Sequence, residues 1–133
     1  MSNVGTGLPL RVFLVEDSPI ILARLTESVT VPGRIEVVGH ADGEAAAVDA
    51  LRVGAWDALV LDLQLRAGSG FGVLQALHRN GRPPGSRVIV LTSFALAHYR
   101  ARCEQLGVDY FFDKARDYDR VLDVLEGMAS GGG

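Results

Sequence analysis

Four short apolar runs in this chain each end in polar or charged residues that packing alone does not explain. Residues 12–15 are followed by Glu16 and Asp17, residues 58–61 by Asp62, residues 88–91 by Thr92 and Ser93, and residues 110–113 by Lys114. Such runs are typical of strands buried on both faces, where an unpaired charge is costly. In open α/β sheets, however, ligands and chemistry gather at the carboxyl ends of the strands. The pattern therefore predicts an α/β protein with a functional site at one edge of its sheet.

Strand and helix patterns alternate along the chain. Strands are expected over residues 11–15, 35–41, 58–61, 87–91 and 110–113. Ser18 and Pro19 predict the start of the first helix, and Pro32 with Gly33 its end. Further helices are expected from Asp42 or Gly43 to Leu51 and over residues 71–80, 95–106 and 118–129. Five strand–helix units with short connections predict one doubly wound parallel sheet with helices on both faces.

The composition narrows the class of protein. With 133 residues, of which 48% are hydrophobic, the chain is long enough for one packed domain and too apolar for disorder. A net charge of −3 without a basic run favours neither nucleic acid nor a membrane as a direct partner. The first ten residues lack the features of a signal peptide, so a cytoplasmic location is predicted. We expect one domain over residues 10–129, flexible ends at 1–9 and 130–133, and a packed thiol at Cys103.

The residues at the strand ends resemble those of the receiver domain of two-component response regulators. The resemblance covers about residues 10–128 and rests on Glu16, Asp17, Asp62, Thr92 and Lys114. The intervals are also similar, with thirty residues from Asp62 to Thr92 and twenty-two from Thr92 to Lys114. Gly70 fits the loop glycine of the family. The resemblance implies a flavodoxin-like five-stranded sheet with strand order 2-1-3-4-5.

The resemblance also implies a phosphoacceptor. Asp62 would be the nucleophile that takes a phosphoryl group from a phosphohistidine, while Thr92 and Lys114 would contact phosphoryl oxygens. Phe111, three residues before the lysine, would be the switch aromatic that moves when the phosphoryl group draws Thr92 inward. The chain would then be a signalling domain that assists its own phosphorylation and dephosphorylation, not an enzyme.

A divalent cation is implied as well. Mg²⁺, or another divalent ion such as Mn²⁺, would be bound directly by Asp17 and Asp62, by the main-chain carbonyl of Gln64, and by Glu16 mainly through water. Electrostatics point the same way, because carboxylates 4 Å apart repel by roughly 4 kcal/mol per pair at an effective dielectric constant of 20. Lys114 can offset only part of that repulsion, so a bound cation completes the site.

Two positions depart from the family pattern. Ala115 follows the lysine, where many receivers have a proline after a cis peptide bond, and a cis bond before alanine would cost about 3–4 kcal/mol. The sequence leaves open whether the Lys114–Ala115 bond is cis or trans. Leu65 and Arg66 stand where methionine and proline are common. Neither change removes a reacting group.

The residues also allow structural alternatives. Glu16 with Asp17, and Thr92 with Ser93, could cap the helices that follow them, and Phe111 could be an ordinary core residue. The chain could also be a flavodoxin-like cofactor enzyme, although the two acidic residues after the first strand would repel a flavin phosphate. It could be a degenerate receiver that acts as a constitutive scaffold, although the acceptor set is complete.

The sequence favours a single-domain response regulator over these alternatives. Its phosphodonor would be a histidine kinase or a histidine phosphotransfer protein, and its target a downstream protein that the sequence does not identify. No direct contact with nucleic acid or membrane is expected.

Overall fold

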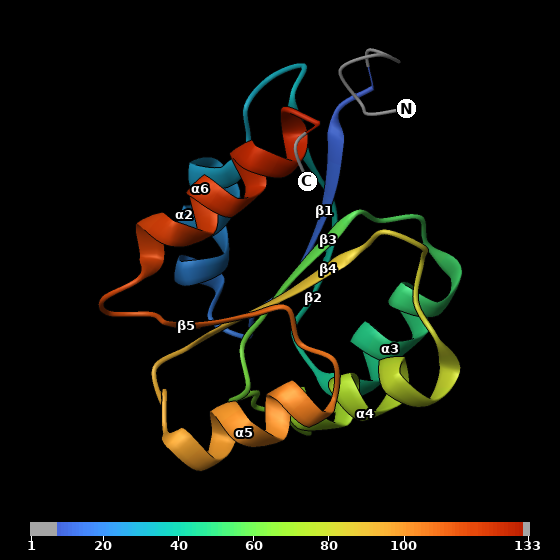
Figure 1. Ribbon diagram of the computed structural model, residues 1–133, viewed down its shortest axis with the longest axis vertical. Coiled ribbons are helices and arrows are strands. Elements are labelled where there is room, and N and C mark those ends of the chain that lie inside the picture. The colour runs from blue at the N-terminus through green and yellow to red at the C-terminus, as the bar shows by residue number, and fades with distance from the viewer. Residues whose placement is uncertain (1–7, 132–133) are drawn as a thin grey trace.

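The computed structural model describes residues 8–131, which form a single five-stranded parallel sheet flanked by helices (Figure 1). The strands are β1 (Leu10–Val15), β2 (Ile35–Ala41), β3 (Ala58–Leu61), β4 (Arg87–Thr92) and β5 (Tyr110–Asp113), in the order β2-β1-β3-β4-β5. The predicted flavodoxin-like sheet is confirmed, strand order included. The domain limits and the flexible ends at 1–9 and 130–133 stay predictions, and residues 1–7 and 132–133 lie outside the described part.

The helices cover both faces of the sheet, as predicted. They are α2 (Pro19–Val29), α3 (Glu44–Val53), α4 (Gly70–Asn80), α5 (Ala97–Gln105) and α6 (Tyr118–Ala129). Figure 1 shows α2 and α6 on one face and α3, α4 and α5 on the other. Leu14 and Val60 pack with Leu125 of α6, whereas Val15 and Leu61 pack with Leu74 of α4. Because both faces are covered, the inner strands β3 and β4 are buried at successive positions, whereas the edge strand β2 alternates between buried and more exposed residues.

The two phenylalanines of β5 illustrate this double burial. Phe111 packs into the core beneath α3, α4 and α5, and Phe112 into the core beneath α2 and α6. Cys103 of α5 is fully buried, and burial raises the pKa of its thiol to about 11. The expectation of a packed thiol is confirmed. Within residues 8–131, no helix is long and apolar enough to cross a membrane.

Side-chain hydrogen bonds cap the starts of α2 and α4 but not those of α3, α5 and α6. Ser18 caps α2 by accepting a 3.3 Å hydrogen bond from the Ile21 amide, with Pro19 at the first helical position, as predicted. α5 begins at Ala97, two residues after the predicted start at about residue 95, and a capping role for Thr92 and Ser93 is wrong. The N-cap residue is Leu96, whose amide donates to the Phe94 carbonyl at 2.9 Å. That turn occupies the residues after β4 and delays the helix.

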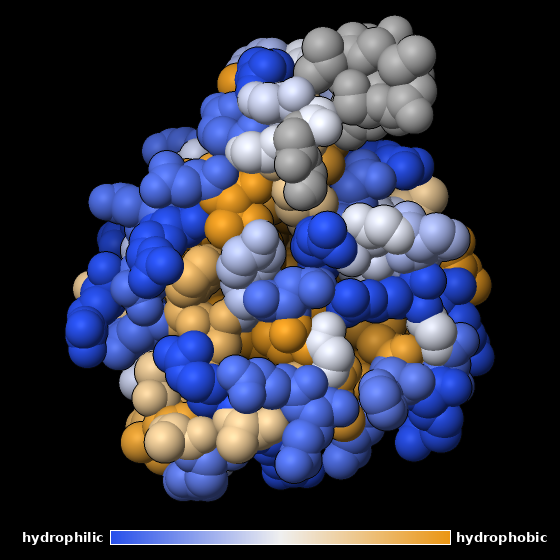
Figure 2. Space-filling view, in the orientation of Figure 1, coloured by the Kyte–Doolittle hydropathy of each residue, from blue (hydrophilic) through white to orange (hydrophobic). Residues whose placement is uncertain are grey.

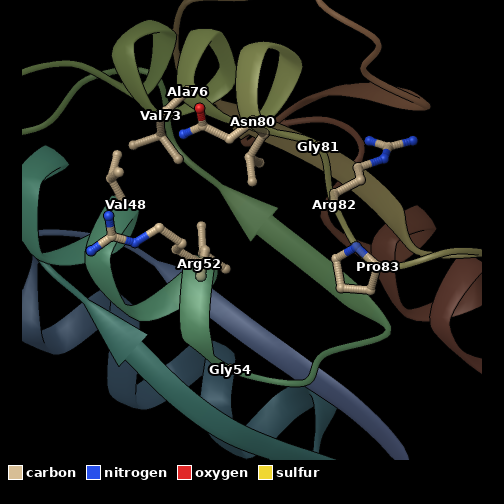
Figure 3. Close-up of a pocket in the computed structure, with 11 residues that line it drawn as sticks. Val48, Arg52, Gly54, Val73, Ala76, Asn80, Gly81, Arg82 and Pro83 are labelled. Atoms are coloured by element: carbon tan, nitrogen blue, oxygen red, sulfur yellow. The ribbon is translucent and has the colours of Figure 1, made fainter.

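A pocket with a volume of about 340 Å³ opens between α3 and α4 (Figure 3). Val48 and Arg52 of α3, Val73 and Asn80 of α4, and Arg82 in the loop before β4 are among the residues that line it. Most of its lining comes from the C-terminal parts of both helices and the loop after α4, near the amino ends of β3 and β4. The polar strand ends that the sequence singles out lie at the opposite edge of the sheet, so this pocket is separate from them.

Candidate functional site

The register of the sheet brings the polar strand ends together. Val15 of β1 pairs with Leu61 of β3, so Glu16 and Asp62 follow partners in adjacent strands. The Asp62 amide donates to the Val15 carbonyl at 3.0 Å, which extends this pairing by one residue. On the other side of β3, Thr92 of β4 pairs with Asp113 of β5, and the Lys114 amide donates to the Thr92 carbonyl at 2.8 Å. Strands β1, β3, β4 and β5 thus deliver their terminal side chains to one edge.

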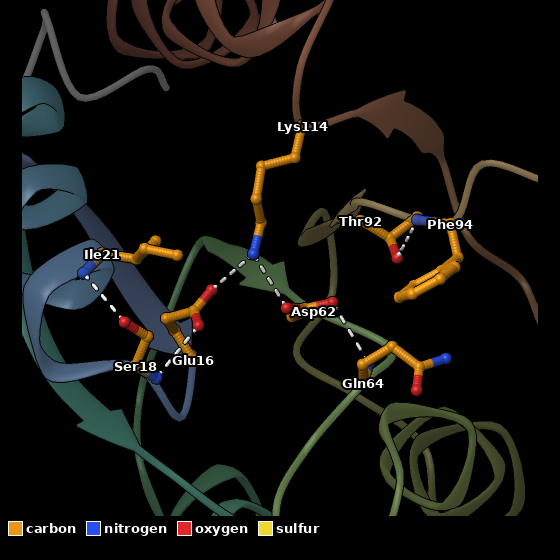
Figure 4. Close-up of polar contacts among 8 residues, drawn as sticks. All are labelled: Glu16, Ser18, Ile21, Asp62, Gln64, Thr92, Phe94 and Lys114. Atoms are coloured by element: carbon orange, nitrogen blue, oxygen red, sulfur yellow. Dashed lines mark hydrogen bonds and ion pairs between the residues drawn. The ribbon is translucent and has the colours of Figure 1, made fainter.

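Lys114 joins two of the carboxylates (Figure 4). Its Nζ lies 2.8 Å from Asp62 Oδ2 and 2.9 Å from Glu16 Oε1. Both acidic side chains are almost completely buried, and that of Lys114 is 16% exposed. Burial alone would lower the pKa of Lys114, but the hydrogen bonds and charges of Asp62 and Glu16 outweigh it and raise the pKa above its ordinary value. Lys114 is therefore a permanent cation at neutral pH, placed between two buried anions.

Each of these carboxylates also accepts a backbone amide with its other oxygen. Asp62 Oδ1 accepts from the Gln64 amide at 3.1 Å, and Glu16 Oε2 accepts from the Ser18 amide at 3.1 Å. Figure 4 shows the resulting chain of contacts from Ser18 through Glu16, Lys114 and Asp62 to Gln64. The capping alternative for Glu16 is thus partly right, since it holds the residue that caps α2, but the same side chain also binds Lys114.

Asp17 lies at the margin of this cluster. It is half-buried and lines an open pocket of about 390 Å³ together with Glu16, His40 and Asp42. Among residues 8–131, no three His, Cys, Asp or Glu side chains are gathered closely enough to form a metal site. The oxygen-rich donor set of Glu16, Asp17 and Asp62 fits a hard divalent cation in its chemistry. The assignment of these residues as metal ligands stays a prediction.

Thr92 and Phe94 form the β4 side of the site. Thr92 is fully buried, and its Oγ1 accepts a 3.1 Å hydrogen bond from the Phe94 amide. Phe94 is 51% exposed, and Figure 4 shows its ring on the side of the site where Gln64 lies. The exposed Phe94 ring thus lies beside the site, and the buried Thr92 hydroxyl lies within the site.

Arg100 of α5 covers the predicted switch residue and was not found from the sequence. Its guanidinium lies 4.6 Å from the centre of the Phe111 ring, and its Nη1 donates to the Phe111 carbonyl at 3.4 Å. Phe111 itself is buried, 7% exposed. A stacked guanidinium over an aromatic ring stabilises that ring position. Residue spacing gives no signal for such a contact between a helix and a strand.

The loop after Lys114 is held by side chains of its own. No cis peptide bond occurs in residues 8–131, so the Lys114–Ala115 bond is trans. Asp113 Oδ1 accepts from the Ala115 amide at 2.8 Å, and Asp117 Oδ2 accepts from the Asp113 amide at 3.0 Å. The question that the sequence left open about this bond is thereby answered.

Replacement of Lys114 by methionine tests the balance of charge in the cluster. Lys114→Met removes the ammonium and leaves two buried carboxylates facing each other, so we expect the free energy of unfolding to fall by about 3–5 kcal/mol at pH 7. Denaturant unfolding of wild type and variant at pH 7 measures the difference. Equal stabilities at pH 7 would contradict the electrostatic role of Lys114.

Comparison with known proteins assigns the family. A family model described as "Response regulator receiver domain" matches residues 12–126, and the chain belongs to this family. The Fimbriae Z protein of Salmonella typhimurium is 24% identical over 92% of this chain and 58% of its own length. Protein-glutamate methylesterase/protein-glutamine glutaminase 3 of Myxococcus xanthus is 35% identical over 78% of this chain and 26% of its own length. This chain therefore spans less than two thirds of these curated relatives.

Solved structures show the same fold. A chain of the CheX–CheY–BeF3–Mg²⁺ complex from Borrelia burgdorferi is 22% identical and superposes with a TM-score of 0.77, covering 92% of this chain and 94% of that one. Receiver domains are signalling domains that generally bind divalent metal ions and interact with histidine kinases and phosphotransfer proteins. The fold and the family are thus established.

Proposed function

We propose that this chain accepts a phosphoryl group on Asp62 and signals by changing its partner-binding face. The observation that carries the proposal is the position of the Asp62 carboxylate. It is buried at the end of the central strand β3, with one oxygen on Lys114 Nζ and the other on the Gln64 amide. A nucleophilic oxygen held beside a cation suits phosphoryl transfer, in which positioning and charge neutralisation contribute most.

The proposed donor is a phosphohistidine of a histidine kinase or a histidine phosphotransfer protein. An Asp62 oxygen attacks the phosphorus, the bond from phosphorus to the imidazole nitrogen breaks, and the imidazole leaves with the electron pair of that bond. Lys114 then exchanges a carboxylate partner for a phosphoryl oxygen. Thr92 Oγ1 accepts a hydrogen bond from the Phe94 amide, and its own proton can be donated to a phosphoryl oxygen.

We further propose Mg²⁺ as the cofactor, with Mn²⁺ as an alternative. Asp17, Asp62 and the Gln64 carbonyl would hold the ion directly, and Glu16 would do so through water. When bound, a divalent ion supplies positive charge close to the phosphoryl oxygens.

The switch would act through Thr92 and Phe111. Movement of the buried Thr92 towards a phosphoryl oxygen would change the space around the Phe111 ring in the neighbouring strand. The stacked Arg100 couples that ring to α5, since it contacts both the ring and the carbonyl of Phe111. Thr92, Phe111 and Arg100 would together transmit the state of Asp62 to the outer surface.

The start of α5 is the surface that would report this change to a downstream protein. Phe94 and Leu96 are large apolar residues that are 51% and 44% exposed. Figure 2 shows an apolar patch at the lower left, where α5 begins in Figure 1. His98 and Tyr99 follow in the first turns of the helix, with ring centroids 4.6 Å apart. Exposed aromatic and apolar side chains of this kind suit a protein partner.

Phe94 should also control the lifetime of the aspartyl phosphate. Its apolar ring would shield the acceptor from the attacking water, whereas a carboxylate at this position can orient one. We expect Phe94→Glu to speed dephosphorylation by roughly tenfold, less than a well-placed general base supplies. Loss of phosphate from pre-loaded protein measures the rate. Val53→Glu, which changes an exposed residue at the end of α3, is the control, and equal decay of all three proteins would exclude the shielding role.

The direct test of the function is phosphoryl uptake. Incubation of the chain with a small phosphodonor and Mg²⁺ should give one acid-labile adduct with the mass of a single phosphoryl group. A protein that remains unmodified with both small donors and histidine-phosphorylated proteins would contradict the proposal. The single-domain organisation, the cytoplasmic location, and the absence of direct nucleic-acid or membrane contacts stay predictions.

A further inference from the structure

Glu44, the first residue of α3, joins that helix to the loop between β3 and α4. Its backbone amide donates to the Ala67 carbonyl at 3.0 Å, next to a parallel bridge between Gly43 and Ala67. Its side-chain Oε1 accepts from the Ser69 amide at 2.9 Å. Ser69 is the N-cap residue of α4, so the Glu44 carboxylate lies where the start of that helix favours a negative charge. Glu44 therefore binds the loop with its backbone at the start of α3 and with its side chain at the start of α4.

The backbone of two glycines packs closely against the Glu44 side chain. A Cβ atom at Gly68, where φ is +82°, would lie 2.5 Å from Glu44 Cβ and 2.7 Å from Glu44 Oε1. A Cβ atom at Gly72, in the first turn of α4, would overlap the Glu44 carboxyl group itself. The loop and the helix thus approach Glu44 with bare backbone, a closeness that only glycine permits.

The far end of the same loop carries the proposed acceptor and metal ligand. An antiparallel bridge pairs Ser69 with Gln64, and the Gly70 amide donates to the Leu63 carbonyl at 3.0 Å. The Gln64 amide in turn binds Asp62 Oδ1. Glu44 therefore holds Ser69, Ser69 is paired with Gln64, and Gln64 contacts Asp62. The chain of contacts runs from the start of α3 to the end of β3.

We infer that Glu44 is a positioning residue for the phosphoacceptor loop. By fixing Ser69 it fixes the Gln64 backbone, and with it the carbonyl that the proposed function assigns to the cation. The inference rests on that proposed function for its consequence but not for the contact itself. Glu44 does not touch the reacting atoms, so its loss should loosen the loop and weaken cation binding without removing a ligand.

The test compares Glu44→Ala with Glu44→Gln and a matched control. Asp119→Ala is the control, because Asp119 is an exposed acid in the first turn of α6, away from the loop. Glu44→Ala should speed hydrogen exchange of the Ser69 amide by about tenfold or more, the effect expected for losing a hydrogen bond to a charged acceptor. Glu44→Gln keeps an acceptor oxygen and should stay close to wild type.

The second readout is Mg²⁺ binding, followed by the amide chemical shifts of Gln64 and Asp62. Glu44→Ala should raise the half-saturating Mg²⁺ concentration by about tenfold, the lower end of the cost of losing support for a metal ligand. Wild-type exchange and Mg²⁺ affinity in a folded Glu44→Ala protein would overturn the inference. Equal changes in Asp119→Ala would overturn it as well, because they would be a general effect of removing a first-turn acid.

Gly72→Ala separates positioning from simple destabilisation. Alanine favours the helix more than glycine does, so any harm must come from the added methyl group displacing the Glu44 carboxyl group. Gly72→Ala should therefore reproduce the faster Ser69 exchange of Glu44→Ala, and it should add nothing in the double variant Glu44→Ala/Gly72→Ala. Effects that add in the double variant would overturn the inference. Amide exchange needs neither metal nor phosphodonor, so failed phosphorylation with altered exchange would count against the proposed function alone.

Discussion

Asp62→Asn is expected to leave the protein folded and to abolish phosphoryl uptake. Asparagine keeps the shape of the side chain and an oxygen for the Gln64 amide, but its amide group is not a nucleophile towards phosphorus. Its side chain also loses the charge that pairs with Lys114 Nζ at 2.8 Å. Intact mass after incubation with a small phosphodonor and Mg²⁺ should show one adduct on wild type and none on the variant.

Asp57→Asn supplies the matched control for this experiment. Asp57 immediately precedes β3, and its carboxylate binds Arg11, with Asp57 Oδ1 3.0 Å from the Arg11 guanidinium. The substitution thus removes an acidic residue at the opposite end of the same strand. The Asp57→Asn variant should take up the phosphoryl group as fully as wild type. Thermal unfolding measures any loss of stability separately. Uptake at the wild-type level by Asp62→Asn would refute the assignment of the acceptor.

Asp17→Asn is expected to have the second largest effect. It removes one proposed direct ligand and one charge, so Mg²⁺ affinity should fall by at least about tenfold, which corresponds to about 1.4 kcal/mol. Phosphoryl uptake should slow markedly at limiting Mg²⁺, and a chelator should block uptake by wild type. Titration of amide chemical shifts with Mg²⁺, followed by uptake rates at several Mg²⁺ concentrations, measures both effects.

A neighbouring acid shows whether charge alone is responsible. Asp42 lines the same open pocket as Asp17 and is exposed. Asp42→Asn removes an equal charge from that pocket but no proposed ligand, so its Mg²⁺ affinity should stay within a small factor of wild type. If Asp17→Asn and Asp42→Asn lower the Mg²⁺ affinity equally, Asp17 acts through the negative charge of the pocket and not as a ligand.

The fold was largely predictable because its strands are short and because the inner strands β3 and β4 are apolar and buried on both faces. The predicted limits of β2, β3 and β5 match those observed, since polar or turn-forming residues flank each run. The start of α5 was missed for a local reason. The turn from Phe94 to Leu96 uses the Phe94 carbonyl, which a helix starting at residue 95 would have needed as its first acceptor.

That Glu16, Asp62, Thr92 and Lys114 lie at one edge of the sheet was predictable, whereas their contacts were not, and their roles stay predictions. The end of each strand indicated Glu16, Asp62, Thr92 and Lys114, because parallel strands bring their carboxyl ends to one edge. The sharing of Lys114 between Glu16 and Asp62 depends on side-chain conformations across 98 and 52 residues of sequence, which spacing does not encode. The Glu44 contact was missed for the same reason, although an acid in the first turn of a helix is a weak signal.

The shared ammonium of Lys114 has a practical consequence for chemical labelling. Lys114 is the sole lysine of the chain, beside twelve arginines. Acylating reagents attack neutral amines, and the contacts with Glu16 and Asp62 keep this one protonated and shielded. The chain therefore carries a single side-chain amine, which does not react with acylating reagents while Glu16 and Asp62 are bound to it. The acylation rate at Lys114 thus reports how the site is occupied.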